Sequence, residues 1–117
     1  MNIEEYRNYS LKLPGVTEGF PFDEKVLVFK VMGKMFLLTD IDTFASFNAK
    51  CEPEKCIELR EQYSGIKPGY HMNKKHWNTI STDGSVPDGL MFEFIKNSYN
   101  LIVAGLTKKL KEELGNC

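Results

Sequence analysis

The sequence predicts an α+β fold, a two-layer sandwich in which an antiparallel sheet carries its helices on one face. Stretches whose apolar residues recur every three or four positions stand at both ends and in the middle of the chain, as in amphipathic helices. Between them lie short runs rich in β-branched and aromatic residues, which favour strands. The connections between these runs are too short for crossover helices, so neighbouring strands should be antiparallel. A length of 117 residues suits a single domain, which we expect to span 1–117.

The chain should begin with a helix over 3–12, followed by a short edge strand over 17–20. Asn2 and Glu5 have the spacing of a capping pair, in which each side chain accepts a hydrogen bond from the other residue's backbone N–H. Pro14 cannot continue a helix, so the first helix must end before it.

A β-hairpin is predicted over 26–31 and 35–39. Both runs are apolar and rich in valine, leucine and phenylalanine, and the short connection between them contains Gly33. A third strand is expected over 43–48, from Thr43 to Asn48.

Pro53 predicts the start of a second helix, because the first helical position needs no backbone N–H. Cys56, Leu59 and Tyr63 follow at spacings that place them on one helical face. The segment 66–75 is expected to be a loop, because Pro68 and Gly69 interrupt the hydrogen-bond ladder that a strand requires.

Another strand should begin near His76, and one long helix should run from about residue 87 to Leu114. Its apolar stripe is formed by Met91, Ile95, Tyr99, Ile102, Leu106 and Leu110. The polar run 96–98 is the place where we expect a kink or a break into two helices.

Charge and composition set limits on the class of protein. The net charge is −1, whereas a strong nucleic-acid binder usually has a basic excess. The first residues are acidic rather than apolar, and no apolar run approaches the roughly 20 residues that span a bilayer, so we expect a cytoplasmic protein with no membrane association. The three cysteines, Cys51, Cys56 and Cys117, predict no disulfide framework; of the first two we expect one buried and one exposed thiol.

No pattern of catalytic residues is present, and we expect no enzyme activity and no cofactor. The serines lack the G-x-S-x-G elbow, and the glycines fit neither a P-loop nor a dinucleotide-binding loop. His71 and His76 are five residues apart, as are Cys51 and Cys56, and neither spacing is typical of zinc ligands. We therefore expect no metal site.

The segment 67–78 is basic and aromatic and has no acidic residue, which indicates DNA binding. Lys74 and Lys75 would contact phosphates, and exposed aromatic rings could stack on unpaired bases. The hairpin carries a second cluster without acids, and the two together could form two wings on one face. The residues expected to bind DNA are Lys30, Lys34, Lys67, Asn73, Lys74, Lys75 and His76, with Tyr70, His71 and Trp77 positioning the loop.

Two other interpretations remain open. In the first, Tyr70, His71 and Trp77 line a groove that binds a protein or a small ligand, and the lysines bind an anion or an acidic protein partner. In the second, Trp77 and Tyr70 fill the core and the lysines only keep the surface soluble.

The stretch from Pro68 to Asn78 resembles the most recognisable part of the MmcQ/YjbR family. Shorter matches occur in the same order elsewhere, at Leu13-Pro14-Gly15, Phe20-Pro21-Phe22, the 29–36 hairpin, Pro53-Glu54 and Ser98-Tyr99. The resemblance covers nearly the whole chain. It implies a CyaY-like (frataxin-like) fold and a DNA-binding role through a double-wing arrangement. The iron binding of frataxin is not implied, because the first helix carries only Glu4 and Glu5 as acids.

Overall fold

The computed structural model describes residues 1–116, which fold into four helices and six strands, and it confirms the α+β class. The helices are α1 (Ile3–Leu11), α2 (Pro53–Gln62), α3 (Asp88–Ala104) and α4 (Lys108–Gly115). The strands are β1 (Val16–Gly19), β2 (Val26–Val31), β3 (Lys34–Asp40), β4 (Ser46–Lys50), β5 (Ile66–Pro68) and β6 (Trp77–Ser81). They form a single antiparallel sheet in the order β1-β2-β3-β4-β6-β5.

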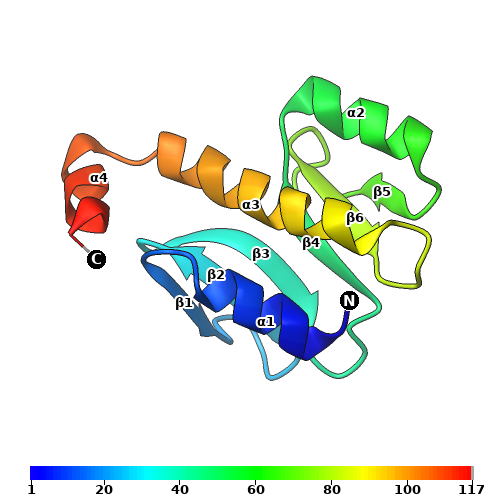
Figure 1. Cartoon of the computed structure of the whole chain (residues 1–117), viewed down its shortest axis with the longest axis horizontal. Helices are drawn as coiled ribbons and strands as arrows, with labels where there is room; N and C mark the ends of the chain where they lie inside the picture. The colour runs from blue at the N-terminus through cyan, green and yellow to red at the C-terminus, as the bar shows by residue number, and fades with distance from the viewer. Residues whose placement is uncertain (117) are drawn as a thin grey trace.

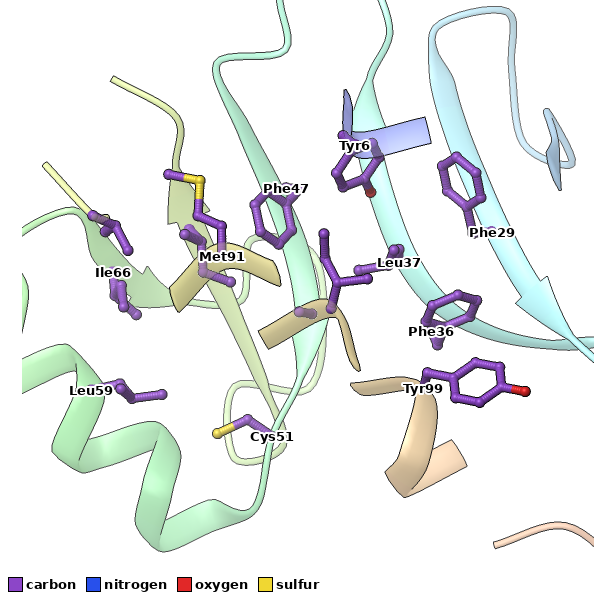
Figure 2. Packing of buried hydrophobic residues seen from close by; sticks show 14 of the residues in the cluster. Tyr6, Phe29, Phe36, Leu37, Phe47, Cys51, Leu59, Ile66, Met91 and Tyr99 are labelled. Atoms are coloured by element: carbon purple, nitrogen blue, oxygen red, sulfur yellow. The ribbon is translucent and has the colours of Figure 1, made fainter. Parts of the chain in front are cut away.

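The helices lie on one face of this sheet, with α3 running across it and α1 and α2 on either side (Figure 1). The main core fills the space between the two layers (Figure 2). At its centre, the ring of Tyr6 lies 5.4 Å from that of Phe29, 5.0 Å from Phe44 and 5.2 Å from Phe47. On the opposite face of the sheet, no helix of residues 1–116 lies over the strands. This face carries only a small apolar cluster of Val28, Leu38 and Trp77, and we call it the uncovered face.

The local signals that begin α1, the hairpin and α2 are confirmed. The Asn2 side chain accepts a hydrogen bond from the backbone N–H of Glu5, and the Glu5 carboxylate accepts one from that of Asn2. Met32 and Gly33 have φ angles of 49° and 81°, the left-handed geometry that a two-residue hairpin turn requires. Pro53 is the first residue of α2, as predicted.

The predicted third strand, 43–48, begins too early. Residues before Ser46 form a turn, in which the Asp40 carboxylate accepts hydrogen bonds from the backbone N–H groups of Asp42 and Thr43. Phe44 follows with a φ of 41°, which no strand residue adopts, yet its side chain is buried in the core. An apolar residue thus reaches the core from a turn, so the aromatic residue at position 44 does not mark a strand.

The prediction of a loop over 66–75 is wrong for its first residues, because Ile66–Pro68 form β5. This strand pairs with β6 and lies at the edge of the sheet, where a residue has one neighbouring strand instead of two. A proline is tolerated there because its missing N–H need not enter a ladder.

The helix predicted from about residue 87 to Leu114 is divided into two helices, but the break does not lie at 96–98. Residues 96–98 lie inside α3, which ends at Ala104, and α4 begins after Thr107. The Thr107 hydroxyl accepts a hydrogen bond from the backbone N–H of Leu110 and so caps the new helix. The apolar stripe continues across the break because Leu106 is buried between the two helices.

The described cysteines, Cys51 and Cys56, are free and both buried, so the expectation of one exposed thiol is wrong. Burial and a hydrogen bond with Cys56 raise the pKa of the Cys51 thiol, which makes it a poor nucleophile. Cys117 lies outside the described residues. No helix within residues 1–116 is long and apolar enough to cross a membrane.

Tyr6 provides a test of the core. Its side chain is fully buried, and its hydroxyl has no hydrogen-bond partner within residues 1–116, while burial raises the pKa of this hydroxyl. Tyr6→Phe removes the buried polar group and keeps the ring, so we expect the free energy of unfolding to rise by about 1 kcal/mol in urea denaturation. Tyr99→Phe is the control, because its hydroxyl donates to the Pro14 carbonyl at 2.6 Å and its removal should destabilise.

Candidate functional site

The connection between β5 and β6 folds back over the uncovered face and is anchored there. The backbone N–H of Tyr70 donates to the Thr79 hydroxyl at 2.9 Å, and the Thr79 hydroxyl donates to the side-chain oxygen of Asn48. The Asn48 amide in turn donates to the Tyr70 carbonyl at 3.3 Å. This closed ring of hydrogen bonds joins the connection to β4 and β6, so its conformation is fixed by the sheet.

Gly69 makes the close approach of this connection to β6 possible. Its backbone N–H donates to the Trp77 carbonyl at 2.9 Å. A Cβ at position 69 would lie 2.7 Å from the Trp77 Cβ and 3.0 Å from the Trp77 carbonyl oxygen. Both distances are too short, and neither Trp77 atom can move away easily because both are fixed by strand β6. Any residue larger than glycine would therefore push the connection off the strand.

Arg60 of α2 is a cation that the sequence interpretation missed. Its guanidinium donates to the side-chain oxygen of Asn78 at 2.7 Å and to the carbonyls of Lys74 and Trp77. The planar group thus joins α2 to the far end of the connection. Nothing in the sequence near Arg60 indicates this role, because its partners lie 14 to 18 residues away.

The connection and the residue before it present three lysines together. Lys67 lies on β5 opposite Thr79, whose side chain is on the uncovered face, and Lys74 and Lys75 follow in the connection. All three are exposed, and none forms an ion pair with any residue of 1–116. We call residues 67–76 the basic segment.

The hairpin lysines are not part of this cluster. Lys30 opposes Met35 on the uncovered face, but Lys34 opposes Val31, whose side chain is in the main core, so Lys34 starts from the helix-covered side. The hairpin turn lies toward α4, whereas the basic segment lies beside α2, and β4 stands between the two strand pairs (Figure 1). The structure therefore separates Lys34 from Lys74 and Lys75.

The aromatic residues of the basic segment divide into exposed and buried groups. The Tyr70 side chain is 70% exposed, and its ring lies 4.0 Å from that of His71, centroid to centroid. Trp77 is buried on the uncovered face, where it packs with Val28 and Leu38. Tyr70 thus does not fill the core, and Trp77 lies under the segment rather than in a groove.

Asn73 and His76 have structural partners. The Asn73 side-chain oxygen accepts a hydrogen bond from the backbone N–H of Lys75 at 2.9 Å, which holds the turn that carries both lysines. The His76 carbonyl accepts one from the backbone N–H of Cys51 at 2.8 Å, and the residue is half-buried.

A hollow of about 520 Å³ lies beside the basic segment on the uncovered face. Its walls come from strands β2, β3, β4 and β6, from the basic segment and from the turn before β2. The lining residues are Phe22, Val26, Met35, Leu38, Thr39, Asp40, Ser46, Phe47, Asn48, Tyr70, His71, Met72 and Thr79. The sequence interpretation placed a groove near Tyr70 and His71 but missed Phe22 and Asp40, which are distant in the chain.

Phe22 is held at the rim by a short turn. The Asp23 carboxylate accepts hydrogen bonds from the backbone N–H groups of Val26 and Lys25, both at 2.8 Å, and these bonds lower its pKa. Within residues 1–116, no group of three histidine, cysteine or acidic side chains is placed to hold a metal ion.

The comparison with known proteins starts from residues 11–101, which match the family model named YjbR. The chain belongs to the YjbR family. It is 37% identical to the protein YbdF of Escherichia coli O157:H7, over 91% of this chain and 88% of that protein. It is 30% identical to the protein YjbR of Escherichia coli K12, over 97% and 98% of the two chains.

Solved structures of similar sequence extend the match to the fold. The crystal structure of protein DR2400 from Deinococcus radiodurans is 42% identical, with a TM-score of 0.90 over 97% of this chain and 88% of that one. A crystal structure of a Pseudomonas syringae protein is 27% identical, with a TM-score of 0.74 over 86% and 98%. The resemblance seen in the sequence is thus confirmed as membership of the YjbR family.

Proposed function

We propose that this YjbR-family chain is a non-enzymatic DNA-binding protein that binds unpaired bases and backbone phosphates with its basic segment. One observation carries the proposal: Lys67, Lys74 and Lys75 are exposed and have no ion pair within residues 1–116, on the same anchored segment as the exposed Tyr70–His71 ring pair. Cations that follow a phosphate backbone, next to rings on which bases stack, are typical of proteins that bind single strands.

The lysines supply the electrostatic part of binding. Because no carboxylate within residues 1–116 pairs with them, each can neutralise a phosphate without first breaking an ion pair. Neutralising three phosphates of a single strand releases about two counterions. Raising salt from 50 to 200 mM should therefore weaken binding roughly twentyfold.

The aromatic pair supplies the preference for unpaired bases. Tyr70 projects from a backbone that two hydrogen bonds fix to the sheet, so its ring is presented at little further cost in conformational freedom. A base stacked on an exposed aromatic ring contributes about 1–3 kcal/mol, and paired bases in a duplex cannot reach it. The contribution of Lys34 and Lys30 is then secondary, because the hairpin turn lies away from the basic segment.

The test is a fluorescence anisotropy titration of labelled single-stranded and duplex DNA of one length, each at 50 and 200 mM salt. We expect tighter binding of the single strand and a loss of roughly twentyfold at the higher salt. An affinity that does not change with salt would overturn DNA binding by lysines. Equal or tighter duplex binding would overturn the assignment of unpaired bases. Polyglutamate that competes as well as DNA would instead indicate an acidic protein partner.

A further inference from the structure

We infer that the hollow on the uncovered face binds a small organic ammonium compound with an aromatic or aliphatic body. This site goes beyond the proposed DNA binding, because the residues that carry it are not the lysines of the basic segment. The inference rests on the shape of the hollow, on the chemistry of its walls and on its charge.

The size and the walls suit a small molecule. A volume of about 520 Å³ falls in the range of ligand pockets, roughly 300–1,000 Å³. The side chains of Val26, Met35, Leu38 and Met72 supply apolar wall, and all four belong to or pack on the apolar cluster of the uncovered face. An apolar ligand body would therefore complete a cluster that no helix covers.

The charge of the hollow selects a cation. Among residues 1–116, Asp40 is the one wall residue with a carboxylate, no lysine or arginine lines the hollow, and His71 is the one wall side chain that can carry a positive charge. The Asp40 Oδ1 accepts hydrogen bonds from the backbone N–H groups of Asp42 at 2.9 Å and Thr43 at 3.1 Å. Its Oδ2 has no partner within residues 1–116 and remains able to accept from a ligand. A phosphate or a carboxylate in the hollow would lie near this carboxylate, with no lysine or arginine in the described wall to offset the repulsion.

The remaining walls are preorganised for such a ligand. Asn48 and Thr79 are held by the hydrogen bonds that anchor Tyr70, so this side of the hollow does not have to be ordered on binding. Phe22 and Tyr70 stand at the rim, 64% and 70% exposed, where aromatic faces can stack on the ligand or attract its positive charge.

The test uses two probes of the same shape and opposite charge, 2-phenylethylamine and 3-phenylpropionate. Methyl NMR of the protein with ¹³C-labelled methionines gives a direct readout, because Met35 and Met72 line the hollow while Met32 and Met91 pack on the helix-covered side. We expect the amine to shift the Met35 and Met72 signals alone, and the carboxylate to shift neither at about 10 mM, where a millimolar ligand would already be mostly bound.

A matched pair of variants tests the charge. Asp40→Asn keeps an oxygen that can hold the turn, and it should weaken binding of the amine about tenfold, as expected for loss of a charged hydrogen bond. Asp42→Asn removes an exposed carboxylate that does not line the hollow and should leave the affinity unchanged.

Three results would overturn the inference. The first is equal binding of both probes, and the second is no shift with the amine at about 10 mM. The third is a change of the Met35 and Met72 signals with protein concentration alone, which would show that the face binds a second copy of the chain. DNA binding can fail or succeed independently of each result, because Asp40→Asn leaves all lysines of the basic segment in place.

Discussion

Replacing Lys67, Lys74 and Lys75 together by alanine should weaken binding of single-stranded DNA on the order of a hundredfold at 50 mM salt. The reason is that most affinity of such proteins at low salt comes from released counterions, and these lysines are the exposed cations of the basic segment. The residual binding should depend only weakly on salt. Anisotropy titrations at two salt concentrations measure both effects.

The chain offers a control with the same change in charge. Lys108, Lys109 and Lys111 are exposed on α4, which lies away from the basic segment (Figure 1). Their replacement by alanine should change DNA affinity only severalfold, through the net charge of the protein. Neither triple variant should lose much stability, because each exposed substitution costs within about 0.5 kcal/mol. An equal loss of affinity in both variants would mean that DNA responds to net charge and not to a site.

Much of the fold was predictable because its signals are local. The capping pair at Asn2, the turn at Gly33 and the proline at the start of α2 each depend on residues within one turn of chain. The errors arose where sheet position overrides local preference. Pro68 is acceptable in a strand because β5 is at the edge, and nothing in the sequence nearby gives the strand order.

The candidate site was predictable only where it is contiguous in sequence. The basic segment was recognised because its lysines and aromatic residues are neighbours along the chain. The separation of Lys34 from Lys74 follows from β4 standing between β3 and β6, which pattern alone does not reveal. The groove expected near Tyr70 and His71 lacked Phe22 and Asp40 for the same reason, since these residues join the hollow only after the sheet has formed.

The sequence also does not reveal which of the two aromatic side chains Trp77 and Tyr70 is buried, because it is compatible with burial or exposure of either. The structure buries Trp77 beneath the basic segment, 8% exposed, and leaves Tyr70 outside. Trp77 contacts the apolar cluster with its ring, and its Cβ and carbonyl lie close to Gly69. It therefore links the stability of the uncovered face to the position of the lysines.

Trp77→Ala is accordingly expected to lower the free energy of unfolding by about 3 kcal/mol, near the lower end of losses for a buried aromatic residue, because the open face lets neighbours relax. Urea denaturation followed by circular dichroism measures the loss without relying on tryptophan fluorescence. The same variant should weaken DNA binding even where it remains folded, since Met72 of the basic segment packs on the apolar cluster that loses the indole ring.

Tyr70→Ala separates stability from binding at the neighbouring exposed ring. Its effect on unfolding should stay within about 0.5 kcal/mol, because the side chain is mostly in solvent. Its effect on single-stranded DNA should be about 1–3 kcal/mol of binding free energy, the contribution of one stacked base. If Tyr70→Ala destabilised the fold as much as Trp77→Ala, the ring would be a packing residue and the stacking surface would not exist. If it changed neither quantity, the lysines alone would account for binding, and duplex and single strands should then bind alike.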